Sequence, residues 1–277
     1  MNKNINKEEI LKLALGVDNS LFRLYINLLD DSSTNYILAA IALIKDGGIN
    51  EKIIDEAKRK KQIKIATMLL EEAINIAGNA YNDADKFKKI ELKNDLKKAY
   101  SYLIAIYGQD SDLNEEILPL KEYTKDANLE SKARYQKYIS EGYKYLSFID
   151  VLYILNIYNG QITRYNVEKI ADAIKYLDLK EKVNIDKVSD QLSIIAGELI
   201  TNDKDLEDSL KLCDFIINND INNEKAYYFK AYINKDKEDF DNLISTYKQI
   251  CVYKHIELLD PLEIIEWCIK NDTSFLV

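Results

Sequence analysis

Apolar side chains recur at intervals of three and four residues along most of the chain, which is the spacing of one face of an α-helix. Before residue 48 this pattern predicts three short helices, and we expect them to pack on one another because helices of that length are marginal alone. Gly16 is expected to end the first helix and Gly47–Gly48 the third. The second helix is predicted from an apolar stripe made of Leu21, Leu24, Tyr25, Leu28 and Leu29.

A longer helical pattern follows residue 50 and contains the strongest basic run of the chain, Lys58–Lys61. A solvated helix face or a loop between helices explains such a run, and a contact with nucleic acid or an acidic partner is the alternative. Further along, Gly78 is expected to let a neighbouring helix approach closely. The partner helix is predicted from Leu96 to Tyr107, after a longer polar connection from Asn82 to Asn94.

The stretch Gly108–Asp112, with Pro119 soon after it, is the best candidate for a domain boundary, because Pro119 disfavours a continuous helix. The chain is therefore divided into an N-terminal helical part, residues 1–108, and a C-terminal part, residues 109–277. One continuous domain with a hinge at this point is the alternative.

A long helical pattern resumes near Ser131 and continues to Leu177. Within it Tyr138, Gly142 and Tyr145 repeat the spacing of Ile74, Gly78 and Tyr81. Two readings fit this region: one helical pair with a long first helix, or a pair followed by an extra helix.

The clearest internal repeat lies in residues 190–257, where the same order of features occurs twice. The first copy spans Asp190 to Asn223 and the second Glu224 to about Glu257, and the equivalent small residues Gly197 and Ala231 are 34 residues apart. A period of that length is typical of stacked helical pairs. After the copies, Pro261 at the first helical position predicts a terminal helix that covers the open end of the stack.

Composition supports helices and limits the partners. Eight Gly and two Pro in 277 residues are too few for a strand-rich fold with frequent turns, so we predict an all-α protein. The net charge of −9 argues against general nucleic-acid binding, which needs clustered Lys and Arg. The three Cys form no CxxC pair, the N-terminus has no apolar signal core, and no run reaches a membrane span. A cytoplasmic protein without a membrane partner is expected.

The sequence offers no group for catalysis or for a cofactor. His255 is the only His in the chain, and neither a GxGxxG nor a GxxxxGK[ST] motif is present to hold phosphates. A metal site needs several converging His or Cys ligands, and the chain has few of either. We therefore expect a protein that is not an enzyme and that binds no metal or cofactor.

In residues 190–257 the chain resembles the tetratricopeptide repeat (TPR) family, in a divergent form. In the second copy Tyr227 and Ala231 match the aromatic and small positions of the family's first helix, and Asn234 departs from its second aromatic. Asp239–Phe240–Asp241 resembles the acidic–aromatic–acidic turn into the second helix. The other correspondences are the match Tyr247, the departure Leu243, the small residues Gly197 and Ser209, the departure Ser193, and the inter-repeat segment Asp220–Ile221–Asn222–Asn223.

This resemblance implies a right-handed superhelical stack of antiparallel helix pairs, a TPR-like α-solenoid, whose first helices line a surface for a peptide or partner protein. One family subtype holds acidic chaperone tails with a clamp of Lys, Asn and Arg. The corresponding positions here are Ile194, Glu198 and Phe229, which excludes that subtype for these copies. The candidate partner-binding residues are Ile194, Glu198, Lys225, Tyr228, Phe229 and Tyr232.

The expected function is a non-catalytic scaffold or adaptor for protein–protein interaction. Packing between repeats is the alternative role of the aromatic candidates, and the 20 Tyr suit interfaces and half-buried helix contacts equally well. Two other functions fit the same architecture. One is a regulator that senses a peptide or binds RNA, and the other is a structural protein that assembles into homo-oligomers.

Overall fold

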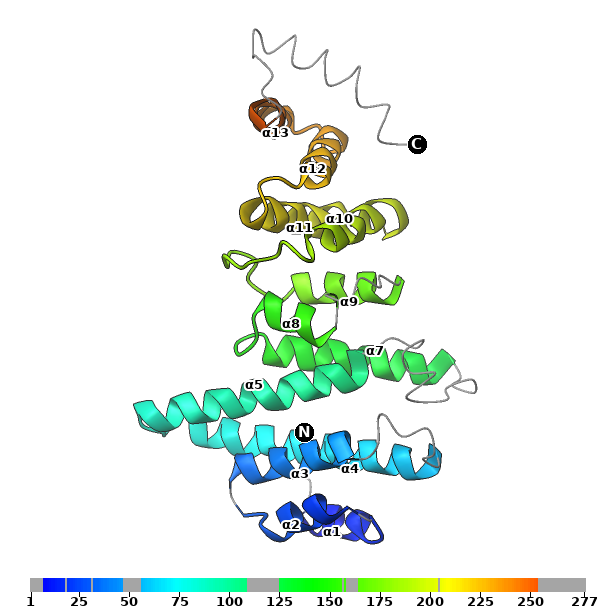
Figure 1. Ribbon diagram of the computed structural model, residues 1–277, viewed down its shortest axis with the longest axis vertical. Helices are drawn as coiled ribbons and strands as arrows, with labels where there is room; N and C mark the ends of the chain where they lie inside the picture. The colour runs from blue at the N-terminus through cyan, green and yellow to red at the C-terminus, as the bar shows by residue number, and fades with distance from the viewer. Residues whose placement is uncertain are drawn as a thin grey trace. The chain divides into compact units, whose positions relative to one another are not determined.

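The computed structural model describes residues 7–17, 19–30, 32–46, 56–108, 125–155, 157, 164–203 and 205–253. These residues form helices joined by short connections and contain no strand, which confirms the all-α prediction (Figure 1). The chain divides into two compact units, Met1–Leu155 and Asn156–Val277. The boundary suggested after residue 108 falls inside unit 1, where α5 and α7 pack on each other.

Unit 1 is a succession of helices in which most pack on the next one along the chain (Figure 1). The three helices expected before residue 48 are present. The helices of unit 1 are α1 Lys7–Ala14, α2 Ser20–Asn27, α3 Ser33–Asp46, α4 Glu56–Tyr81, α5 Lys86–Gly108, α7 Lys125–Gly142 and α8 Phe148–Ile154.

The connection between α1 and α2 follows the expected helix signals. Gly16 has a φ of 81°, in the left-handed region where glycine is favoured after a helix end. Asn19 then caps α2 by accepting a hydrogen bond from the backbone nitrogen of Phe22 at 2.7 Å. Short polar signals of this kind are local, so the sequence shows them directly.

The apolar stripe predicted for α2 does not face the core. The buried residues of this helix and the turn after it are Phe22, Ile26 and Leu29, whereas Leu21 and Leu24 are 47% and 54% exposed. Both faces of α2 carry large apolar residues, so the spacing alone allows either face to be buried. The contact with α3 selects the face that contains Phe22.

Glycine marks a close helix contact at Gly142 but not at Gly78. A Cβ atom built on Gly142 would lie 2.8 Å from Cγ of Tyr100, so α7 and α5 meet there without room for a side chain. The same construction at Gly78 meets nothing within 4 Å. The close approach predicted at Gly78 is therefore wrong, because this residue lies where no neighbouring helix covers α4.

The polar connection predicted from residue 82 to residue 94 is also wrong. Only residues 82–85 are non-helical, and α5 begins at Lys86. The polar composition of this segment favours a loop. However, its Lys, Glu and Leu residues are good helix formers on an exposed surface. Asp85 caps the helix by accepting hydrogen bonds from the backbone nitrogens of Phe87 and Lys88, both at 2.9 Å.

Unit 2 contains the two copies of the internal repeat as two helical pairs (Figure 1). The second helices of these pairs, α11 and α13, begin 34 residues apart, and each has 14 residues. With α9, the region from 131 to 177 holds three helices, which supports the reading of a pair followed by an extra helix. The helices are α9 Arg164–Ile174, α10 Ser189–Glu198, α11 Leu206–Asn219, α12 Glu224–Asp236 and α13 Phe240–Tyr253, with a π-helical segment Leu199–Asp203 after α10.

The second pair is held by a small apolar core. Tyr227 and Ala231 of α12 and Leu243 and Ile250 of α13 are buried together. Burial of such side chains is the main favourable term in folding. The aromatic and small positions matched in the sequence therefore lie in the contact between α12 and α13. The side chain of Tyr247 lies outside the described residues.

The inter-repeat segment Asp220–Asn223 is tied to α10 by buried hydrogen bonds. Asn223 caps α12 by accepting from the backbone nitrogen of Ala226 at 3.0 Å, and Ser193 Oγ lies 2.8 Å from the same Asn223 oxygen. Asn223 Nδ2 in turn donates to Ser189 Oγ at 3.3 Å, and Ser189 Oγ donates to Asp220. At Ser193, where the resemblance to the repeat family would place an aromatic residue, the hydroxyl instead joins the two repeats.

Some expectations fall on parts of the chain that the structure does not describe. These are the stretch from 109 to Pro119, the terminal helix at Pro261 and the side chains of Cys268 and His255. Among the described helices, none has a stretch sufficiently long and apolar to cross a bilayer.

Candidate functional site

The six candidate partner-binding residues lie on α10 and α12, two helices of unit 2 that contact each other. We call this the α10–α12 surface. Ile194 is 46% exposed and Lys225 is exposed, so both are available to a partner. Glu198, Tyr228, Phe229 and Tyr232 are half-buried.

Phe229 has a packing role at the centre of this surface. Its Cζ atom would lie 2.9 Å from a Cβ atom on Gly197, so the ring rests directly on the backbone of α10. The absence of a side chain at Gly197 therefore allows this close contact. Ile194 lies one turn before Gly197, and Lys225 lies one turn before Phe229, so the two exposed candidates flank this contact. Tyr228 also packs against the α12–α13 core, and its hydroxyl lies 3.4 Å from Glu224 Oε1.

A second surface, absent from the sequence predictions, lies between α5 and α8 in unit 1. We call it the α5–α8 groove; it has a volume of about 630 Å³. Lys97 Nζ crosses it to Asp150 Oδ1 at 2.8 Å. The lining residues are Asn94, Lys97, Lys98, Ser101, Tyr102, Ala105, Asp150, Tyr153 and Ile154.

Asp150 is fixed by its position at the start of α8. Ser147 and Asp150 form a capping box, in which the serine side chain accepts from the Asp150 backbone and the carboxylate accepts from the Ser147 backbone at 2.9 Å. Desolvation by burial opposes ionisation, but the hydrogen bonds from Lys97 and Ser147 outweigh it and hold the pKa of Asp150 below its usual value. The groove therefore contains a fixed ion pair with Tyr153, 78% exposed, beside it.

Most of the α5 wall of this groove lies in the helix predicted from Leu96 to Tyr107, and only Asn94 falls in the segment predicted as a polar connection. The second wall, α8, was predicted as helical, but nothing in the sequence indicates that it meets α5.

Tyrosine in unit 1 mostly joins helices. Tyr100 stacks on Tyr145 with ring centroids 5.9 Å apart, and Tyr107 meets Tyr138 at 5.7 Å. Tyr138 also donates to Glu71 Oε1 at 2.7 Å, and burial followed by this carboxylate raises the pKa of its phenol strongly. These rings use their apolar faces for packing and their hydroxyls for buried hydrogen bonds.

Metal-binding side chains do not cluster among the described residues. No group of three or more His, Cys, Asp or Glu side chains among them converges on a point where a metal ion could bind. Burial raises the pKa of the Cys213 thiol to about 12, so this thiol stays protonated at neutral pH. In the basic run, Lys61 Nζ donates to the backbone oxygen of Leu15 at 2.9 Å, and the run lies on helix α4.

The α10–α12 surface and the α5–α8 groove are thus the two candidate sites that the geometry offers. Comparison with known proteins assigns no family: no protein-family model, no curated protein and no solved structure matches this chain.

Proposed function

We propose that the protein is a non-catalytic scaffold that binds a peptide or a segment of a partner protein through the α10–α12 surface, as a divergent TPR-like protein. The observation that carries this proposal is the register of the two helical pairs. Because α11 and α13 begin 34 residues apart and α10 contacts α12, the first helices of consecutive pairs present one shared surface.

The chemistry of this surface suits a protein partner. Ile194 is a large apolar residue that is 46% exposed, and half-buried tyrosines lie on the neighbouring helix. Aromatic residues with limited freedom and a polar end are frequent anchors in interfaces. Lys225, exposed at the start of α12, adds a charge at the rim, where it favours association with acidic groups.

The test is affinity capture from the native organism, read by mass spectrometry, with matched variants. Ile194→Asp combined with Lys225→Glu should remove the captured partner, because the first change places a charge in the apolar centre and the second reverses the rim. Val252→Asp is the control, since Val252 is 68% exposed on α13, away from the surface. A partner captured equally by all three proteins, or no partner enriched by the wild type, contradicts the proposal.

A further inference from the structure

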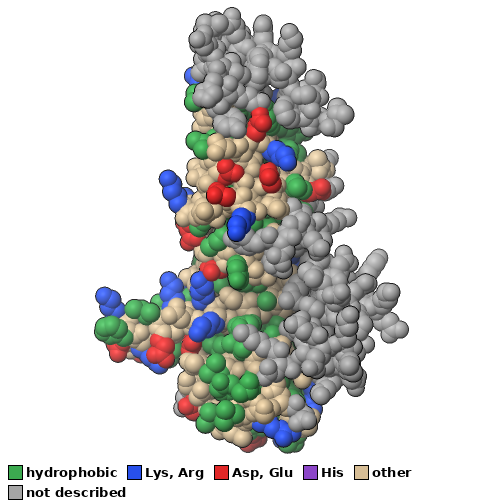
Figure 2. All heavy atoms as spheres, viewed as in Figure 1, with side chains coloured by type: hydrophobic (Ala, Val, Ile, Leu, Met, Phe, Trp, Pro, Cys, Tyr) green, Lys and Arg blue, Asp and Glu red, His purple; other side chains and the backbone are tan. Residues whose placement is uncertain are grey.

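Helix α5 presents a continuous exposed stripe that begins at its free N-terminal end and runs into the α5–α8 groove. The stripe, which we call the α5 stripe, starts with Phe87 and Ile90, which are 83% and 55% exposed. Figure 2 shows hydrophobic side chains together with charged side chains of both signs over the protruding ends of α4 and α5. At spacings of three or four residues the stripe consists of Phe87, Ile90, Asn94, Lys98, Ser101 and Ala105.

Lysines border this stripe. Helix α5 contains six Lys and two acidic residues, in a chain whose net charge is −9. Lys86 and Lys93 are exposed and seven residues apart, so they lie along one edge of the stripe, and Lys98 lies within it. A positive helix face in an acidic protein attracts negatively charged groups selectively.

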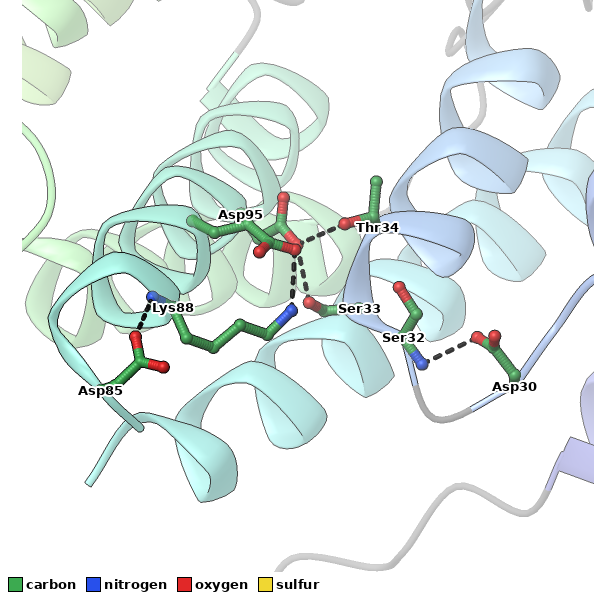
Figure 3. Close-up of polar contacts among 8 residues, drawn as sticks. Asp30, Ser32, Ser33, Thr34, Asp85, Lys88 and Asp95 are labelled. Carbon is green, nitrogen blue, oxygen red and sulfur yellow. Dashed lines mark hydrogen bonds and ion pairs between the residues drawn. The ribbon is translucent and has the colours of Figure 1, made fainter. Parts of the chain in front are cut away.

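The acidic residues at this end of α5 are already engaged within unit 1. Glu91 pairs with Lys88 at 2.8 Å. The buried Asp95 accepts hydrogen bonds from Ser33 Oγ at 2.7 Å and Thr34 Oγ1 at 2.8 Å, which anchors α5 to the start of α3 (Figure 3). Asp85 caps the helix. The carboxylates therefore hold the helix in place, while lysines remain on its exposed face.

We propose that the α5 stripe docks an acidic amphipathic segment of a partner protein, at a surface separate from the α10–α12 surface. Apolar residues of the segment contact Phe87 and Ile90, and its carboxylates pair with Lys93 and Lys98. Its far end enters the α5–α8 groove beside Tyr153. From Phe87 to Ala105 the stripe is about 27 Å long, which matches a partner helix of about five turns.

A protein segment fits these observations better than a nucleic acid. Phe87 and Ile90 are apolar contact points that a phosphate backbone leaves uncovered. An acidic amphipathic helix instead satisfies both features at once, since its apolar face and its carboxylates can alternate with the same spacing as the stripe.

The probe is a displayed library of random 20-residue peptides, selected against the full chain, with binding of the enriched peptides measured by fluorescence anisotropy. The peptides are expected to be acidic, with apolar residues three and four apart. Affinity should fall at least ~10-fold, the effect of one interface hot spot, in Lys93→Glu/Lys98→Glu and in Phe87→Ala/Ile90→Ala. Lys182→Glu/Lys187→Glu is the matched control, because these exposed lysines belong to unit 2, are not part of the stripe and give the same change of charge.

The proposal would be overturned if no peptide is enriched, if the enriched peptides lack an acidic bias, if the stripe variants bind them equally, or if the control loses binding. Binding of a 20-nucleotide oligouridine that Lys93→Glu/Lys98→Glu abolishes would assign the stripe to nucleic acid and also overturn it. Peptides that lose affinity only in Ile194→Asp would overturn this proposal and leave the proposed function standing. Circular dichroism of each variant confirms that the helices are intact.

Discussion

The joint between the two repeats in unit 2 depends on Asn223, and replacing this residue tests how the pairs are held in register. Asn223 is 5% exposed, and its side-chain oxygen accepts from the Ala226 nitrogen and lies 2.8 Å from Ser193 Oγ. Its Nδ2 donates to Ser189 Oγ. Asn223→Ala removes the helix cap and the link to the preceding pair in one step.

The expected loss follows from these contacts. Losing an N-cap costs ~1 kcal/mol, and losing a buried hydrogen bond costs ~1 kcal/mol more. Ser193 Oγ also lies 2.9 Å from the backbone oxygen of Ser189, so its hydroxyl keeps one partner and the full penalty of an orphaned group does not apply. The free energy of unfolding of unit 2 should fall by about 2 kcal/mol in Asn223→Ala.

The assay is urea unfolding followed by far-ultraviolet circular dichroism, with Asp239→Ala as the matched control. Asp239 caps α13 through the Asn242 nitrogen at 3.2 Å but is exposed and makes no bond to the preceding pair. The loss in Asn223→Ala should therefore be larger. A double-mutant cycle with Ser193→Ala should give a coupling of ~1 kcal/mol. Equal losses in the two cap variants, together with zero coupling, would refute the reasoning.

Two further predictions use the same unfolding assay. Gly142→Ala should destabilise the protein by ~1–3 kcal/mol, because its Cβ would meet the Tyr100 side chain at 2.8 Å. Gly78→Ala should stabilise the protein by ~0.5–1 kcal/mol, because the space around Gly78 is open. A larger loss in Gly78→Ala than in Gly142→Ala would contradict the packing described. Burial, and then the charge of Asp205, raises the pKa of Asp208, so its stabilising contribution is present below the unfolded pKa and is lost as the pH rises through the folded pKa. Asp208→Asn should therefore raise the urea midpoint near neutral pH and have little effect below the ordinary aspartate pKa; an unchanged midpoint at neutral pH would disprove this.

Local signals in the sequence proved reliable where the cause is local. Gly16, expected to end the first helix, lies just after it in the left-handed conformation. In the structure Asn223 and Asp205 cap the helices that follow them, through bonds that also involve only a few neighbouring residues. The register of the repeat is also predicted reliably, because the two helical pairs share a period of 34 residues and a regular apolar spacing.

The predictions are wrong where a polar composition does not correspond to a loop. The start of α5 is polar, which predicts a connection rather than a helix. Its residues are nevertheless good helix formers that face solvent. Phe87 and Ile90, at the start of the α5 stripe, fall in this segment, whereas most of the α5 wall of the groove lies in the helix predicted from Leu96 to Tyr107. The candidate residues of the α10–α12 surface lie on two helices that contact each other. The packing of Phe229 on Gly197 could not be predicted from the sequence, because it depends on which helix lies opposite.

The sequence by itself determined that the described chain is helical, where its repeat begins and where its first helix ends, since these follow from apolar periodicity and from short-range backbone preferences. Only the tertiary structure decided which face each helix buries. Leu21 and Leu24 are exposed while Phe22 is buried, and Gly142 is crowded while Gly78 is open. The physical reason is that burial depends on which helix lies opposite, and the residues that meet there, such as Tyr100 and Gly142, are far apart in the chain.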